Sequence, residues 1–128
     1  MSSPLSKSEA RRYRKFLQSE IEAASMYRIL SRFESDPERS EIFEQLSQSE
    51  IRHAQHWNQK LGNNSTNIVL QNNTPKLIYI RLICSMFGPN KVLPWLARIE
   101  SKEIGAYIGE VDGQELLAEE KDHARILS

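Results

Sequence analysis

The sequence predicts an all-α protein, a four-helix bundle with one long crossover connection and a short extra helix before its third bundle helix. Three observations support this prediction. The alternation of polar and apolar residues that marks strands is nearly absent, helix start and stop signals recur, and carboxylate and histidine residues fall on the apolar faces of the expected helices. At 128 residues, we expect one domain, 1–128, around one continuous core.

The first two helices are expected at residues 7–34 and 37–61. The Ser-x-x-Glu motif at residues 6–9 has the spacing of a capping box, which satisfies free backbone amides at a helix start. The Asp-Pro pair at residues 36–37 ends one helix and begins the next, because aspartate accepts from free amides and proline fits a first turn. Gly62 follows as a C-cap glycine. A turn this short predicts an antiparallel hairpin.

An Asn-rich segment at residues 62–74 separates this hairpin from the rest of the chain. A loop of this length in a compact domain needs a structural reason, and a crossover between two helices that run in the same direction supplies one. A short apolar helix is expected at 75–87, closed by the Gly-Pro pair at 88–89. The third and fourth bundle helices are then expected at 91–110 and 113–127.

One pattern of chemically active residues occurs twice: a glutamate, a tyrosine seven residues later, and then Glu-x-x-His. Residues three or seven apart on a helix share one face, so both members of each pair should project into the core. The first copy is Glu20, Tyr27, Glu50 and His53, and the second is Glu100, Tyr107, Glu120 and His123.

Four carboxylates in one core would repel each other, and each is costly to bury alone. Two divalent cations would match their charge, and two neutral imidazoles would complete the coordination. Carboxylates and imidazoles with open positions favour iron or manganese over a structural zinc site. The predicted ligands are Glu20, Glu50, His53, Glu100, Glu120 and His123; Tyr27 and Tyr107 are expected to hydrogen-bond ligating carboxylates across the bundle.

Other polar residues near these motifs have alternative interpretations. Glu103 lies one turn after Glu100 and is either an additional ligand or a surface carboxylate. His56 lies one turn after His53 but has no counterpart in the second copy, so we interpret it as a surface or supporting residue. The carboxylates interpreted as solvated are Glu22, Glu110 and Glu119.

Composition narrows the possible functions. The formal net charge is zero, so nothing predicts attraction to nucleic acid or to an anionic membrane, and the basic cluster at 11–15 is interpreted as a solvated helix face. The single cysteine, Cys84, excludes an intrachain disulfide and a Cys-rich metal site, and is expected to be a buried apolar residue. Without a secretory signal or an apolar run of about 18–20 residues, the protein is expected to be cytoplasmic.

The repeated motifs resemble those of the ferritin-like superfamily, and specifically of rubrerythrin-type di-iron domains, which place two glutamates as at positions 100 and 103. A closer resemblance is to the ferritin-like domain fused to vacuolar-iron-transporter-like membrane domains, the membrane-bound ferritin or erythrin family. The segment FGPNKVLP is more particular to that family. The matching stretches are SEIEAASMYRIL, FEQLSQSEIRHAQHW, FGPNKVLPWLARIESKEIGAY and LAEEKDHARIL, which together cover most of the chain.

The resemblance implies that the six predicted ligands hold two iron ions, for which manganese or zinc can substitute. It implies that Glu103 is a glutamate that changes coordination with the iron oxidation state. The implied activity is that of a ferroxidase or peroxidase-type oxidoreductase, which oxidises Fe(II) with peroxide or dioxygen. Rubrerythrin's rubredoxin domain is missing from the sequence. The alternatives are an iron-sensing module without turnover, a peroxide reductase with an external electron donor, and a metal-free interaction domain.

The resemblance also concerns partners. Relatives pair through bundle faces, and the apolar helix at 75–87 needs a cover, so a homodimer is expected. The chain ends shortly after His123 without a C-cap signal, so either the last helix frays there or a longer protein continues, in which case the resemblance implies an iron-export membrane domain. That arrangement would place this domain at the cytoplasmic face of a membrane.

Overall fold

The computed structural model describes residues 5–62, 68–70 and 73–127, and within them all regular structure is helical. This confirms the all-α prediction. Residues 63–67 and 71–72 of the expected crossover lie outside the described residues. The helices are α1 (Lys7–Phe33), α2 (Pro37–Lys60), α3 (Pro75–Phe87), α4 (Leu93–Ile108) and α5 (Gln114–Leu127), with 3-10 turns η1 (Pro89–Lys91) and η2 (Val111–Gly113).

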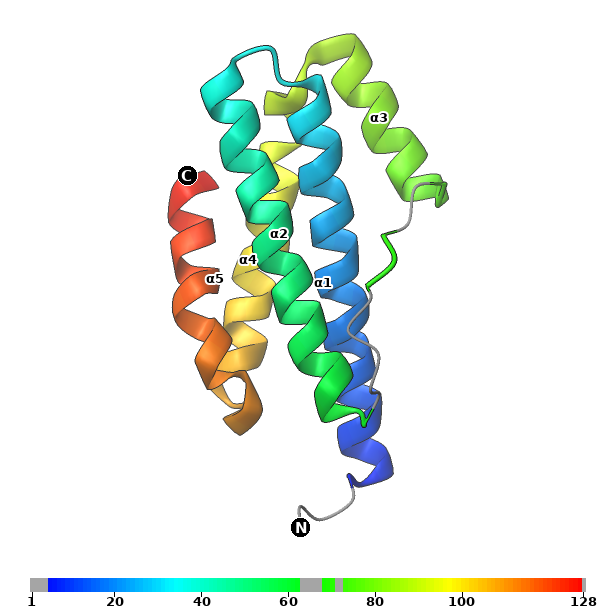
Figure 1. The fold of residues 1–128 in the computed structure, drawn as a ribbon, viewed down its shortest axis with the longest axis vertical. Helices are drawn as coiled ribbons and strands as arrows, with labels where there is room; N and C mark the ends of the chain where they lie inside the picture. Colours follow the sequence, from blue (N-terminus) through cyan, green and yellow to red (C-terminus); the bar gives the residue numbers. More distant parts are fainter. Residues whose placement is uncertain (1–4, 63–67, 71–72, 128) are drawn as a thin grey trace.

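Helices α1 and α2 form a long antiparallel hairpin (Figure 1). The expected capping box is present: Ser6 Oγ accepts from the Glu9 amide at 3.1 Å, and the Glu9 carboxylate accepts from the Ser6 amide at 3.2 Å. At the turn, the Asp36 carboxylate accepts from the amide of Glu38 at 3.1 Å and begins α2. Local capping chemistry therefore sets both helix starts of this hairpin.

Helices α4 and α5 pack on each other as a second hairpin, and its first helix is shorter than the sequence predicts. One helix was expected over 91–110, but α4 runs only from Leu93 to Ile108 and follows the separate turn η1. Gly88 has a φ of +84°, a conformation that favours glycine, and it separates α3 from that turn. At the far end, the Gln114 side-chain amide donates to the last carbonyls of α4 and to the Glu110 carbonyl in the connection, which closes a tight turn into α5.

The buried apolar residues form two clusters that lie on either side of a polar layer. On α1 the order is Tyr13 in one cluster, Glu20 in the layer and Met26 in the other cluster. On α4, Leu96 and Tyr107 belong to opposite clusters and flank the polar layer in the same way. The polar side chains are thus enclosed between the two hairpins, while α3 lies outside against α1 (Figure 1).

Among the described residues, none of the helices combines the length and the apolarity that crossing a bilayer requires.

Candidate metal centre

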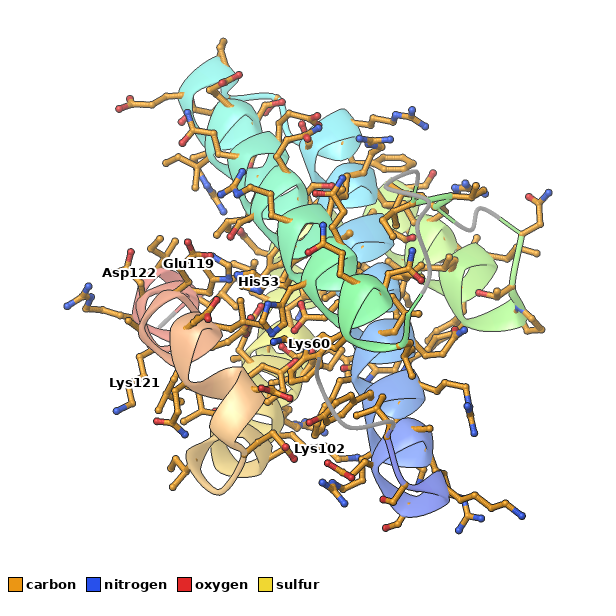
Figure 2. All side chains as sticks on the ribbon, turned by 60° about the horizontal axis from the view of Figure 1, so that its bottom comes forward. His53, Lys60, Lys102, Glu119, Lys121 and Asp122 are labelled. Atoms are coloured by element: carbon orange, nitrogen blue, oxygen red, sulfur yellow. The ribbon has the colours of Figure 1, made fainter. Side chains whose placement is uncertain are left out.

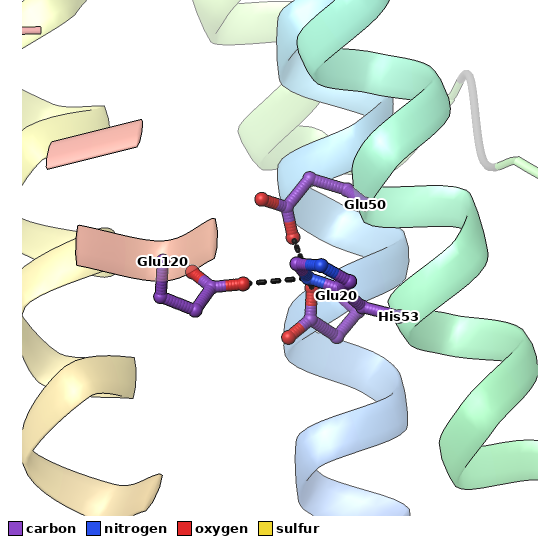
Figure 3. Close-up of side chains that lie close together, drawn as sticks. All are labelled: Glu20, Glu50, His53 and Glu120. Atoms are coloured by element: carbon purple, nitrogen blue, oxygen red, sulfur yellow. Dashed lines mark ion pairs between the residues drawn. The ribbon is translucent and has the colours of Figure 1, made fainter. Parts of the chain in front are cut away.

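Six carboxylate and histidine side chains from α1, α2, α4 and α5 converge in the polar layer. They form two sets in which one ligand atom from each residue lies within 4.8 Å of the others. All six are buried: the four glutamates are 0% exposed and the two histidines 1% and 6%. The first set, drawn in Figure 3, is Glu20, Glu50, His53 and Glu120; the second is Glu50, Glu100, Glu120 and His123. Glu50 and Glu120 belong to both sets.

Both imidazoles turn Nδ1 toward carboxylates of the opposite hairpin. The Nδ1 atom of His53 lies 2.6 Å from Glu120 Oε1, and the Nδ1 atom of His123 lies 2.7 Å from Glu50 Oε1. The two rings are nearly parallel, with an interplanar angle of 17° and centroids 5.8 Å apart. Because each histidine faces a glutamate from the other hairpin, neither hairpin alone can form either set.

Each tyrosine of the repeated pattern donates a hydrogen bond to a glutamate of the other hairpin. Tyr27 on α1 donates to Glu100 Oε1 at 2.7 Å, and Tyr107 on α4 donates to Glu20 Oε1 at 2.6 Å. Trp57 in turn donates from Nε1 to the Tyr107 oxygen at 3.0 Å. Burial raises the pKa of both phenols, and the neighbouring carboxylates raise it further, so both remain protonated donors.

Several buried carboxylate oxygens have no hydrogen-bond partner among the described residues. Such oxygens are expensive in a protein interior, where buried polar atoms are nearly always satisfied. Here they are directed into one layer, together with two imidazole nitrogens. This donor set fits a pair of divalent cations. The oxygens of the site without a hydrogen-bond partner are Glu20 Oε2, Glu50 Oε2, Glu100 Oε2, Glu103 Oε2 and Glu120 Oε2, whereas Glu120 Oε1 has only its ion-pair contact with His53.

Without metal, protons must compensate this negative charge. Burial raises the pKa of Glu50 to about 8, and burial also raises the pKa of Glu20 and Glu120, with further contributions from neighbouring carboxylates. Burial alone would lower the pKa of His53, but its contacts with Glu20 and Glu50 outweigh that effect and raise it to about 11. A metal ion that binds here must therefore displace protons.

Glu100 behaves differently from the other three glutamates of the layer. Burial opposes its ionisation, but its contacts with His123 and Glu120 and the hydrogen bond from Tyr27 outweigh burial and lower its pKa to about 2. The layer therefore holds at least one carboxylate that stays charged beside others that stay protonated, the distribution expected when like charges crowd one site.

Glu103 lies at the edge of this centre. Its side chain is 5% exposed, so the interpretation as a surface carboxylate is wrong. Ser19 donates to its Oε1 at 2.6 Å, whereas its Oε2 belongs to the unsatisfied oxygens above. Burial raises the pKa of Glu103 to about 8, and the charge of Glu20 contributes to this rise. Glu103 belongs to neither set of four, and its role as an additional ligand stays a prediction.

The interpretation of Glu119 as solvated was incomplete. Its side chain is 49% exposed, yet its Oε2 contacts Nε2 of His53 and accepts from Ser49 Oγ at 3.1 Å (Figure 2). This contact orients the imidazole so that Nδ1 faces the layer, a common arrangement for histidine ligands of metals. No spacing in the sequence indicated this contact, because the two residues lie on different helices.

His56 does not join the layer. Its Nε2 lies 2.6 Å from the carbonyl oxygen of Asp112, so it attaches the end of α2 to the turn between α4 and α5. Asp112 also accepts from Tyr13 at 2.6 Å and pairs with Lys60 at 3.6 Å. Cys84 is buried with a free thiol, which confirms its interpretation as a core residue.

Comparisons with known proteins identify no relative: no family model matches the chain, and neither a curated protein nor a solved structure is found to be similar.

Proposed function

We propose that the chain is a ferritin-like four-helix bundle of the rubrerythrin type, which binds two iron ions between its hairpins and oxidises Fe(II) with peroxide or dioxygen. One observation carries this proposal: two sets of buried ligands share Glu50 and Glu120. Shared carboxylates are what a dinuclear centre needs, because Glu50 and Glu120 would then each be a ligand common to both ions. Two separate mononuclear sites would have no use for common ligands.

In this proposal, the bound iron pair supplies the redox chemistry. The chain contributes geometry and protection from water. Tyr27 and Tyr107 each donate to one oxygen of a glutamate that belongs to a single set, Glu100 and Glu20 respectively, and leave its other oxygen free for metal. The two apolar clusters exclude bulk solvent above and below the layer. Protons held by Glu50 and Glu120 leave when metal binds, so affinity should increase with pH.

A second part of the proposal concerns the partners of the domain. Helix α3 exposes more than half of each of five apolar side chains, and we propose that a second copy covers this face in a homodimer. We further propose that the domain receives or senses iron at the cytoplasmic face of a membrane, for an iron-export domain. The exposed side chains are Ile78, Tyr79, Leu82, Met86 and Phe87.

Anomalous scattering from crystals grown with iron or manganese tests the dinuclear centre directly. We expect two peaks about 3.5–4 Å apart, between Glu50 and Glu120. Glu50→Ala should remove both peaks, and His123→Ala should weaken the one beside Glu100. Glu41→Ala, on the exposed face of α2, serves as the matched control. Full occupancy by metal in both ligand variants would contradict the assignment.

Stopped-flow mixing of Fe(II)-loaded protein with peroxide or dioxygen tests the activity. Oxidation faster than that of free Fe(II) supports the proposed ferroxidase. If two metal peaks are present but oxidation is no faster than in buffer, the iron-sensing alternative replaces it.

A further inference from the structure

The two copies of the repeated pattern differ in the residue that follows the Glu-x-x-His motif by four positions. The first copy has Trp57 at that position, whereas the second has Leu127. Trp57 is 0% exposed, and its Nε1 donates to the Tyr107 oxygen at 3.0 Å. Tyr107 in turn donates to Glu20 Oε1 at 2.6 Å. One phenol therefore connects a buried indole to a predicted metal ligand.

A second tyrosine extends this connection toward the surface. The ring of Trp57 lies between those of Tyr107 and Tyr13, with centroid distances of 5.5 Å and 4.9 Å. Tyr13 is 2% exposed and lines a groove of about 770 Å³ between α1 and the end of α4. Its hydroxyl donates to Asp112 Oδ2 at 2.6 Å. Three side chains that can be oxidised thus form a row from this groove to Glu20.

The other tyrosine of the pattern has no such row behind it. Tyr27 also donates to a glutamate of the layer, Glu100. Among the described residues, its aromatic contact is with His123, whose ring centroid lies 6.5 Å away. Imidazole is much harder to oxidise than indole or phenol. Support of a glutamate by tyrosine therefore does not require an indole, and Trp57 adds a capacity for electron transfer on one side of the layer.

The proposed oxidation of Fe(II) gives such a capacity a use. Reduction of dioxygen to water takes four electrons, whereas two Fe(II) ions supply only two when they become Fe(III). Tyrosine and tryptophan give up electrons only to strong oxidants, so they can act while an O–O bond is being reduced. Because the rate of electron transfer falls exponentially with distance, short steps between buried rings are faster than one long step from solvent.

We propose that Tyr13, Trp57 and Tyr107 form an electron relay, through which a small one-electron reductant of the ascorbate type in the groove supplies electrons to the dinuclear centre. This inference rests on the proposed function, because the oxidised centre is what withdraws the electrons.

Each step of the relay moves one electron inward and accounts for its proton. Tyr107 gives an electron to the oxidised centre, and its phenolic proton moves to Glu20 Oε1. Trp57 then gives an electron to the Tyr107 radical, which recovers its proton from Glu20. Tyr13 reduces the Trp57 cation and passes its proton to Asp112, which returns it when the reductant reduces the Tyr13 radical. Overall, ascorbate loses one electron and releases one proton to water, the centre gains the electron, and the side chains end unchanged.

Freeze-quench electron paramagnetic resonance tests the relay in Fe(II)-loaded protein mixed with dioxygen. Trp57→Phe interrupts the row behind Tyr107, so we expect a tyrosyl radical that ascorbate quenches several-fold more slowly than the wild-type radical. Tyr107→Phe should lose the radical signal. Tyr13→Phe, which interrupts the row at the groove and keeps its ring, should also slow quenching by ascorbate.

Trp95→Phe is the matched control, because it replaces the other tryptophan of the chain. The Trp95 ring packs edge-on against Tyr79 at a centroid distance of 6.0 Å, outside the row. We expect the radical and its quenching by ascorbate to match wild type. Equally slow quenching in Trp95→Phe would contradict the proposed path.

Photo-oxidation of the metal-free protein tests the same path without the centre. A ruthenium tris-bipyridine complex, oxidised by a light flash, removes one electron from the protein, and transient absorption distinguishes tyrosyl from tryptophanyl radicals. All proteins carry Tyr79→Phe and Trp95→Phe, which remove the competing aromatic pair. We expect a tryptophanyl radical on the buried Trp57, and Tyr13→Phe should lower its yield several-fold. An equal yield would overturn the proposed path.

The two proposals fail in different ways. If the protein binds no iron, the dinuclear centre itself is wrong. If iron binds and is oxidised, but no radical forms or ascorbate quenches it equally fast in wild type, Trp57→Phe and Tyr13→Phe, the centre stands and the relay is wrong.

Discussion

The two hairpins carry the same pattern of glutamate, tyrosine and Glu-x-x-His, but they are held in the molecule by different interactions. Helices α1 and α2 have 27 and 24 residues and bury nine and eight of them, mostly apolar or small. Helices α4 and α5 have 16 and 14 residues and bury only four and three. The buried residues of the second hairpin are Leu96, Glu100, Glu103, Tyr107, Leu116, Glu120 and His123.

Most of what the second hairpin buries therefore belongs to the polar layer. The first hairpin has an apolar interior of its own, whereas the second docks on it mainly through carboxylates, one imidazole and one tyrosine. Since metal would neutralise that layer, metal occupancy should decide how firmly the second hairpin is attached to the first.

The largest effect is expected in the first hairpin. Leu30 on α1 is fully buried in the larger apolar cluster, so Leu30→Ala should lower the free energy of unfolding by about 2–5 kcal/mol. The same truncation at Leu116 on α5, 8% exposed in the smaller cluster, should cost less than about 2 kcal/mol. Urea denaturation of the metal-free proteins measures both. Equal costs would contradict the asymmetry between the hairpins.

Metal binding should act mainly on the second hairpin. At a free metal concentration 100 times the dissociation constant, one bound ion stabilises the folded state by about 2.7 kcal/mol. Thermal denaturation with and without Co(II) measures the total effect. Hydrogen exchange locates it, and we expect the gain in protection to be larger in α4 and α5 than in α1 and α2. Uniform protection of all four helices would show that the second hairpin is equally firm without metal.

Removing the hydroxyl of each tyrosine should cause a smaller loss of stability, and the loss should differ between the two hairpins. Tyr107→Phe leaves an oxygen of Glu20 and the indole N–H of Trp57 without their partner, whereas Tyr27→Phe affects Glu100 alone. Each lost partner costs about 1–3 kcal/mol when it stays buried, so Tyr107→Phe should destabilise the metal-free protein more. Thermal unfolding compares the variants, with Tyr79→Phe on the exposed face of α3 as the control. A larger loss from Tyr27→Phe would reverse the expected order.

The last comparison concerns pH. Glu50 in the first hairpin and Glu103 in the second both have a pKa raised from 4.5 to about 8, so their protonated forms are favoured in the folded state. That contribution is fully present below pH 4.5 and is lost as the pH rises to about 8. The metal-free protein should therefore become less stable across this window. Glu103→Gln should make the loss shallower in urea titrations at several pH values; an unchanged slope would mean that Glu103 does not contribute.

Local features of this fold could be predicted from neighbours in the chain. The capping box at Ser6 and Glu9 occurs as expected, because its partners are three residues apart. The start of α4 was placed two residues early because the 3-10 turn η1 precedes Leu93, and a 3-10 turn and the first turn of a helix have similar sequence preferences. The contact between Glu119 and His53 could not be predicted, since no spacing relates residues on α5 and α2.

By itself, the sequence determined which side chains share a helical face, because the helix repeat places Glu50 beside His53 and Glu120 beside His123 whatever surrounds them. Only the tertiary structure decided that the two faces meet with Glu50 and Glu120 common to both ligand sets and that Glu103 is buried. The physical reason is that charge compensation and burial depend on distances between helices, and these arise only when the hairpins pack.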